Sequence, residues 1–259
     1  MTNHRKATIA ARFDAAHHYE QAASIQKRCA TTLASWIKKE HRTEKPKHIL
    51  EFGCGTGLLS RALIEAFPQG HYHLTDIAPA MVERTRYHCA ALPAHIRCYV
   101  MDGEAPLPHQ APPEGFDLIT SNLCLQWFED RARAFQALTQ LLRPGGRLMV
   151  STLQAGSLHQ WWESCHATAT ACGVPDYPTL TQLEQDWPAH GRGVWRGEAM
   201  HDPIPSARDF LQGLRRIGAS LPRHTHRPAA QLRKAMRYFD AHYDHVTYHA
   251  AFGLFQKGV

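Results

Sequence analysis

The chain has 259 residues, a formal net charge of +6 and seven cysteines. No apolar run approaches the roughly 18 residues of a membrane-spanning helix, and the length suits one α/β domain with an insertion rather than two independent domains. The odd cysteine count, without a C-x-x-C pair, argues against a disulfide framework. These features predict a cytoplasmic protein that is neither secreted nor inserted in a membrane.

Residues 6–39 are predicted to be helical, because apolar side chains such as Ile9, Phe13 and Leu33 recur on one stripe. This helix precedes the first expected strand, where it can form a lid over a ligand pocket. Within it, Tyr19 is positioned so that its hydroxyl would enter the pocket. A tyrosine in the core or at the surface is an equal alternative.

The segment 48–57, with the sequence HILEFGCGTG, places a buried strand directly before a glycine-rich turn, and a helical run over 58–67 follows. Glycines at 53, 55 and 57 allow the backbone to turn tightly and to approach a ligand closely. A dinucleotide fingerprint would read G-x-G-x-x-G, whereas here the third glycine comes one residue early. A plain tight turn is the alternative. The spacing Glu51-x-Gly-x-Gly-x-Gly resembles motif I of the class I S-adenosylmethionine (SAM) methyltransferases.

A second strand is predicted over 71–75, and it stops at Asp76. In doubly wound sheets the acid at the end of the second strand faces the sugar, so Asp76 can accept both ribose hydroxyls. The alternative is that Asp76 caps the helix expected to begin near Pro79, and both roles are compatible. The sequence therefore predicts Asp76 as the ribose ligand.

A third strand over 96–101 leads into Asp102-Gly103-Glu104, an acidic turn that methyltransferases of this class often have. The Asp102 carboxylate would accept a hydrogen bond from the adenine amino group. The fourth strand, over 116–122, is followed by Leu123–Trp127 at the point where a substrate would face the methyl group. Residues 141–150 then read as a helix end, a Pro-Gly-Gly turn and a fifth strand.

These five elements, in order over residues 48–152, predict an α/β protein with the Rossmann-like fold of class I SAM-dependent methyltransferases. Its sheet is expected to have seven strands and to be mostly parallel. The cofactor that the resemblance implies is SAM. The cofactor-binding residues that this resemblance implies are Glu51, Gly53, Gly55, Gly57, Asp76, Ile77, Met81, Asp102, Gly103, Glu104, Asn122 and Leu123.

Beyond the fifth strand, a helical cap is expected within the same domain. It includes Trp161-Trp162, a proline-punctuated stretch over 175–205 and a helix that Ser206 can N-cap and Gly218 can end. A strand over 246–255 would return to the sheet. The expected organisation is one domain, with lid helices over 1–45, the core over 46–155, the cap over 156–243 and the final strand over 244–259.

Basic residues are concentrated over 192–196, 208–216 and 223–234, which suggests an acidic partner or solvated helix faces. Few aromatic residues lie between them, unlike the pattern that stacks single-stranded bases. The pairs His71-x-His73 and His224-x-His226 lack a carboxylate or cysteine at ligand spacing, so no metal site is predicted.

Four further segments narrow the family. They are FDAAHHYE at 13–20, SNLCLQW at 121–127, LRRIGA at 214–219, and TYH with FG at 247–253. Together they are similar to the malonyl-acyl carrier protein O-methyltransferases, which start the synthesis of the pimelate moiety of biotin in bacteria. The resemblance spans nearly the whole chain. A lysine is common in that family where Arg215-Arg216 stands here, so the anion-binding residue stays open between the two.

The resemblance implies methyl transfer from SAM to the free carboxylate of malonyl-acyl carrier protein, with no nucleic acid or membrane partner and no metal. A carboxylate is already nucleophilic at neutral pH, so no general base is expected. Arg215 or Arg216 would position the carboxylate, with Tyr19 as a hydrogen-bond partner. A basic cap would recruit an acidic carrier.

Three alternatives remain at this stage. A small-molecule carboxylate methyltransferase of the aconitate type would share the core and an arginine clamp. A nucleic-acid methyltransferase would usually show a motif such as N-P-P-Y after the fourth strand, where this chain has SNLC at 121–124. A non-catalytic SAM-binding or scaffolding protein is the alternative from a different class. The intact motif I, Asp76 and Asp102 argue against it, and failure to bind SAM would revive it.

Overall fold

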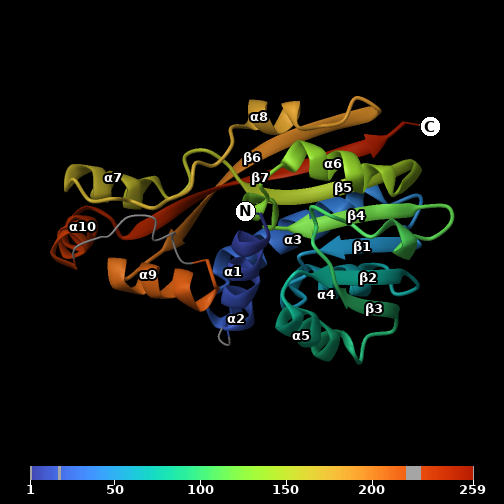
Figure 1. The fold of residues 1–259 in the computed structure, drawn as a ribbon, viewed down its shortest axis with the longest axis horizontal. Helices are drawn as coiled ribbons and strands as arrows, with labels where there is room; N and C mark the ends of the chain where they lie inside the picture. The colour runs from blue at the N-terminus through green and yellow to red at the C-terminus, as the bar shows by residue number, and fades with distance from the viewer. Residues whose placement is uncertain (1, 17–18, 220–228, 259) are drawn as a thin grey trace.

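The structure is a computed structural model that describes residues 2–16, 19–219 and 229–258. Its centre is a seven-stranded sheet with the order β3-β2-β1-β4-β5-β7-β6 (Figure 1). The strands are β1 (His48–Phe52), β2 (His71–Asp76), β3 (His95–Val100), β4 (Phe116–Asn122), β5 (Leu142–Leu153), β6 (Gly191–Pro203) and β7 (His245–Lys257).

Ten α-helices and two short 3-10 helices are found in the described part of the chain. The helices before β4 are α1 (Thr2–Asp14), α2 (Tyr19–Ala22), α3 (Ser24–Glu40), α4 (Leu58–Ala66), α5 (Pro79–Cys89) and η1 (Pro108–Gln110). Those after β4 are η2 (Leu125–Trp127), α6 (Arg131–Gln140), α7 (His159–Ala167), α8 (Leu180–Gln185), α9 (Ala207–Arg216) and α10 (Ala229–His242). None of them is long and apolar enough to cross a bilayer.

The predicted seven-stranded, mostly parallel sheet is confirmed. Strands β1 to β5 run parallel to one another, and β7 runs antiparallel between β5 and β6. The strand order reverses between β1 and β4, because β2 and β3 lie on one side of β1 and β4 and β5 on the other. Ligands of such sheets bind beyond the carboxyl ends of the strands at this switch point.

Helices cover both faces of the sheet because successive strand side chains point to opposite faces. In β1, Ile49 packs into a core shared with α3, α4 and α5. Its neighbours Leu50 and Phe52 pack into a second core with Phe135 of α6 and Leu183 of α8. This layering buries both faces of the parallel strands, as parallel sheets require.

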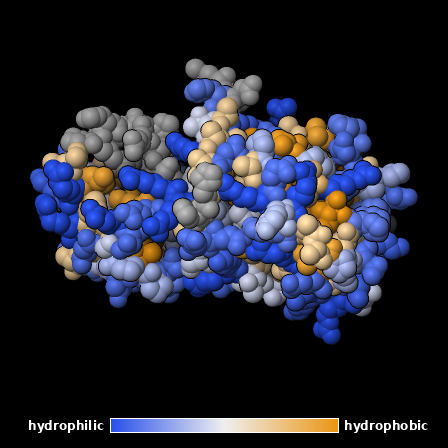
Figure 2. Space-filling model, turned by 90° about the horizontal axis from the view of Figure 1, so that it is seen from below, coloured by the Kyte–Doolittle hydropathy of each residue, from blue (hydrophilic) through white to orange (hydrophobic). Residues whose placement is uncertain are grey.

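A cap with its own core lies at one end of the molecule, where β6 and β7 extend beyond the other strands towards α7, α9 and α10 (Figure 1). Trp161, Phe210 and Phe239 are the largest fully buried side chains of this core. Seen from below, the surface is mostly hydrophilic and its apolar side chains form small patches (Figure 2). The predicted signals at Ser206 and Gly218 are confirmed, since Ser206 Oγ accepts the Asp209 N–H and Gly218 follows α9 with a φ of +72°.

The N-terminal region differs from the single helix expected over 6–39, because α1 ends at Asp14 and two further helices follow. The carbonyl oxygens of Asp14 and Ala16 accept hydrogen bonds from the Arg84 guanidinium at 3.0 and 2.7 Å. The Asp14 carboxylate accepts the Ala80 N–H at 2.9 Å. Contacts with α5 thus supply hydrogen-bond partners for the backbone carbonyls at the end of α1. No local sequence pattern predicts these contacts.

Part of the predicted helical cap was wrong, because residues 191–203 form β6, the edge strand of the sheet. Only Trp195 and Met200 are buried among its side chains. A half-buried strand usually shows alternating apolar residues. Residues 191–203 lack this pattern, because the positions between Trp195 and Met200 are exposed and glycines stand at 191, 193 and 197. Pairing with β7 along its whole length defines this strand.

The Pro-Gly-Gly segment lies inside β5 rather than in a turn before it. Strand β5 begins at Leu142, and its pairing with β4 shifts register between Phe116 and Leu118. Gly145 has a φ of +74°, which favours glycine at this irregularity. The predicted His224-x-His226 pair lies outside the described residues.

Candidate active site

The glycine loop follows β1 and turns sharply beneath the pocket. Gly53, Gly55 and Gly57 have φ values of +63°, +58° and +86°, so the backbone is left-handed at each, as the sequence predicted. A Cβ on Gly53 would also lie 2.6 Å from the Cys124 sulfur. Gly57 is the N-cap residue of α4.

Asp76 ends β2 and is buried beside this loop. Its Oδ2 accepts the Gly55 N–H and its Oδ1 accepts the Ala78 N–H, both at 2.9 Å. Burial raises the pKa of Asp76 to about 6, although the backbone hydrogen bonds oppose this shift. Each carboxylate oxygen keeps acceptor capacity for a further donor, such as a ribose hydroxyl. The residue before α5 is Ala78, so Asp76 supports the start of that helix without being its N-cap.

One pocket brings together the loop, Asp76 and the acidic turn after β3. The space between its walls measures about 670 Å³, including open solvent at the mouth. Ten of the predicted site residues line it: Tyr19, Gly53, Gly55, Asp76, Ile77, Asp102, Gly103, Glu104, Asn122 and Leu123.

Three predicted cofactor residues lie outside this lining. Glu51 is buried against α4, where it accepts the Ser60 hydroxyl at 2.6 Å, and burial raises its pKa to about 8. Gly57 starts α4, and Met81 is buried in a small cluster with Ala16. Glu51 and Gly57 therefore contribute to the structure next to the loop, and Met81 packs against the lid.

The two predicted clamp residues are also outside the pocket lining. Arg215 and Arg216 are exposed near the end of α9, the buried face of which carries Phe210 and Leu214. The structure therefore does not bring either arginine together with the cofactor loop. Their role remains a prediction.

Helix α1 supplies one wall of the pocket, which the sequence predicted only as a lid. Lys6, Ile9 and Phe13 line the pocket. They recur at intervals of three and four residues, the spacing of one helix face, and this period was the signal available in the sequence. The Phe13 ring meets the edge of Trp127, with centroids 5.5 Å apart.

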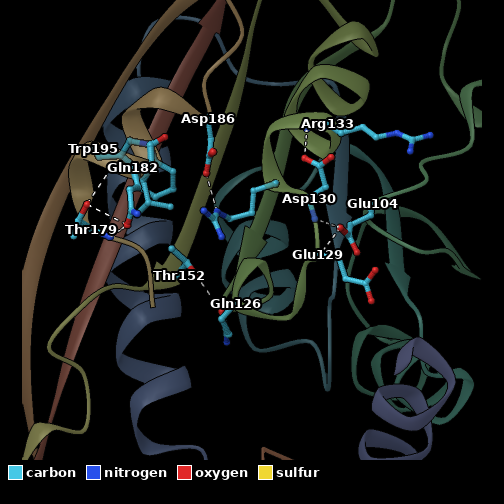
Figure 3. Close-up of polar contacts among 12 residues, drawn as sticks. Glu104, Gln126, Glu129, Asp130, Arg133, Thr152, Thr179, Gln182, Asp186 and Trp195 are labelled. Carbon is cyan, nitrogen blue, oxygen red and sulfur yellow. Dashed lines mark hydrogen bonds and ion pairs between the residues drawn. The ribbon is translucent and has the colours of Figure 1, made fainter. Parts of the chain in front are cut away.

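Lys6 forms ion pairs with both acids of the turn after β3, and it was not predicted from the sequence. Its Nζ lies 2.6 Å from Asp102 Oδ2 and 2.9 Å from Glu104 Oε2. Burial lowers the pKa of Lys6, but the hydrogen bonds and charges of the two acids outweigh it, so the pKa is raised. Figure 3 shows the other Glu104 oxygen, Oε1, at the backbone of Glu129 and Asp130, whose N–H groups it accepts at 2.8 Å each.

The end of β4 is fixed by a polar network. Leu123 has a φ of +51°, which costs about 1–2 kcal/mol for a residue with a Cβ. Its N–H donates to Ser151 O and Oγ at 3.0 Å. Gln126 donates to Leu123 O at 2.7 Å. It accepts a hydrogen bond from the Thr152 hydroxyl at 3.3 Å (Figure 3). The Asn122 amide donates to the Gln26 carbonyl of α3.

Four further lining residues, Met101, Cys124, Trp127 and Phe128, were not predicted as ligands, although two of them lie in the segment recognised after the fourth strand. Tyr19 lines the same space, and burial, followed by the Asp76 charge, raises its pKa well above the usual value. Its phenol is therefore neutral at physiological pH and available as a hydrogen-bond donor. Among the described residues, no three His, Cys, Asp or Glu side chains are grouped to hold a metal ion.

A glycine loop at the switch point of a sheet with an antiparallel last strand defines a class I methyltransferase. The model of the family described as "Methyltransferase domain" matches residues 50–148, which contain the loop, Asp76 and the acidic turn. The solved structure of YcgJ from Bacillus subtilis has a TM-score of 0.61 at 13% identity, covering 88% of this chain and 99% of that one. At this identity the likeness concerns the fold alone.

Two relatives narrow the family. The malonyl-[acyl-carrier protein] O-methyltransferase of Magnetococcus marinus is 35% identical over 98% of this chain and 93% of its own length. The biotin biosynthesis bifunctional protein BioCD of Bordetella avium is 38% identical over 96% of this chain, which spans 52% of that protein. The chain belongs to the malonyl-[acyl-carrier protein] O-methyltransferase family.

Proposed function

We propose that this methyltransferase transfers a methyl group from SAM to the free carboxylate of malonyl-acyl carrier protein and thereby starts pimeloyl-moiety synthesis for biotin. The observation that carries the proposal is the 35% identity to a malonyl-[acyl-carrier protein] O-methyltransferase over 98% of the chain. The match includes the lid and the cap as well as the cofactor core. These outer segments distinguish one acceptor from another on a shared fold.

SAM is the expected methyl donor, and the pocket supports this. Asp76 has acceptor capacity for the ribose hydroxyls, and Asp102 lies at the end of the pocket where the adenine amino group is expected. The backbone at Gly53 and Gly55 carries no side chain, so the methionine portion can approach it closely. In this assignment the methyl group points towards Asn122, Leu123 and Tyr19.

The chemistry requires positioning rather than proton transfer. The malonyl carboxylate attacks the methyl carbon in line, and charge on carboxylate and sulfonium is neutralised as the methyl moves. A pocket that excludes water favours this less charged transition state. The apolar wall of Ile9, Phe13 and Trp127 supports that environment. The neutral Tyr19 hydroxyl can donate to the substrate without taking a proton from it.

Arg215 and Arg216 remain the candidates for recognition of the acidic substrate. Because both are exposed on α9, they are available to a docked carrier without rearrangement. Holding the malonyl carboxylate inside the pocket would require one of them to change its direction. An exposed pair would act mainly on association, which salt would weaken.

The test is mass spectrometry of malonyl-acyl carrier protein, malonyl-CoA and free malonate after incubation with the enzyme and SAM. The expected result is the mass of one added methylene on the carrier form, formed much faster than on either small molecule. Equal rates on all three would reject the carrier as the preferred substrate. No gain on any of them would reject the malonyl acceptor and move the search to other free acids.

A further inference from the structure

Glu20 follows Tyr19 on α2, and the proposed reaction assigns it no role. Its carboxylate contacts the two helices beside the cofactor loop. Glu20 Oε1 lies 3.2 Å from both Nη1 and Nη2 of Arg61 on α4, and 3.6 Å from His88 Nδ1 on α5. Two elements far from α2 in the sequence therefore meet at one carboxylate oxygen.

The same two side chains, Arg61 and His88, contact the cofactor loop itself. Arg61 Nη1 donates to the Thr56 carbonyl at 3.3 Å, and His88 Nδ1 lies 2.8 Å from that oxygen. Thr56 stands between Gly55 and Gly57. Burial by itself would raise the pKa of Glu20, but the neighbouring Arg61 guanidinium lowers it overall. One polar cluster thus joins α2 to the loop expected to hold SAM.

Helix α2 needs such an anchor. It has four residues, too few to be stable by its own hydrogen bonds. On its other side Tyr19 and Ala22 pack against the cap core. The position of the Tyr19 hydroxyl therefore depends on how α2 is held between the cap and the Glu20 contacts.

We propose that Glu20 is a positioning residue: through Arg61, His88 and Thr56 it sets the position of Tyr19 and couples the cofactor loop to the acceptor end of the pocket. The substrate side of this inference rests on the proposed function, whereas the anchoring of α2 does not. Glu20 and Arg61 side chains are 36% and 30% exposed, so their ion pair contributes little to global stability. Its loss is expected to move α2 rather than unfold the protein.

The kinetic test compares Glu20→Gln, Tyr19→Phe and the double variant with malonyl-acyl carrier protein as acceptor. Glu20→Gln is expected to lower kcat by about tenfold, since a small displacement of a positioning group has effects of this size or larger. If Glu20 acts through Tyr19, Glu20→Gln has no further effect in the Tyr19→Phe background. Additive losses, or an unchanged kcat for Glu20→Gln, would overturn the proposal.

Glu83→Gln is the matched control, because it removes an exposed ion pair with Arg86 on α5 away from the pocket. Its kcat and melting temperature are expected to match those of the native enzyme. Glu20→Gln is expected to match the native melting temperature closely while losing kcat. A fall in kcat that follows a fall in folded protein would indicate a purely structural role and overturn the assignment.

Hydrogen exchange separates this proposal from the choice of acceptor. With SAM bound and no acceptor present, Glu20→Gln is expected to raise amide exchange over residues 19–23 and 54–57, and Glu83→Gln is not. Equal exchange in the native enzyme and Glu20→Gln would reject the anchor whatever the substrate proves to be. An enzyme inactive on every malonyl acceptor, but with the expected exchange pattern, would reject the proposed acceptor and keep the anchor.

Discussion

Lowering the pH from 7 to 5 is expected to weaken SAM binding about tenfold, because Asp76 must be ionised to accept both ribose hydroxyls. Burial raises the pKa of this carboxyl to about 6. A group with that pKa is about nine-tenths ionised at pH 7 and about one-tenth ionised at pH 5. SAM binds the ionised form better, so affinity rises with pH through 6, and the tenfold change corresponds to about 1.4 kcal/mol.

Isothermal titration calorimetry at pH 5, 6 and 7 measures this change, and far-UV circular dichroism at each pH confirms that the protein is folded. Asp76→Asn keeps the size of the side chain and cannot ionise. It is expected to bind SAM more weakly at pH 7 and to show no change in affinity between pH 5 and 7. Its amide has one acceptor oxygen, whereas Gly55 and Ala78 both donate to the native carboxylate.

Glu51→Gln is the control for the second buried acid. Burial raises the pKa of Glu51 to about 8, so this group is mostly protonated throughout the range tested. Its substitution should leave the pH dependence of SAM binding in place. Equal SAM affinity at pH 5 and 7 in folded native protein would refute Asp76 as the ribose ligand.

Other substitutions test the loop, the cap and the sheet. Gly55→Val is expected to abolish SAM binding while the fold persists, because φ is +58° there; unchanged affinity by calorimetry would refute the loop assignment. Arg216→Ala, or failing that Arg215→Ala, should raise KM for the malonyl carrier much more than KM for SAM, and equal effects would count against carrier recognition. Burial lowers the pKa of His73 in the folded protein to about 4. As pH falls below 6.5, this histidine is therefore protonated in the unfolded chain before it is protonated in the folded protein. The free energy of unfolding is expected to fall by up to about 3 kcal/mol by pH 4. His73→Phe should reduce that loss in urea unfolding at pH 7 and 5; an unchanged difference would mean that other groups cause it.

The fold and the cofactor side of the pocket were predictable because their signals are local. A left-handed φ favours glycine at 53 and 55, and the strand before them carries buried side chains on both faces. Asp76 stands at the end of the neighbouring strand, and parallel strands bring their carboxyl ends to one edge. Edge strand β6 lacked such a signal, since only two of its side chains are buried.

The sequence by itself thus determined the parallel strands of the sheet, the loop and the acids around the pocket, since each follows from backbone conformations and side-chain periods within a few residues. Only the tertiary structure decided what covers them. Lys6 meets Asp102 across 96 positions of the chain, and Arg84 ends α1 through carbonyls about 70 positions away. The tertiary structure also leaves Arg215 and Arg216 exposed, because α9 packs on the cap core through Phe210 and Leu214 on its apolar face. Contacts of this range depend on how whole elements pack, which no local pattern encodes.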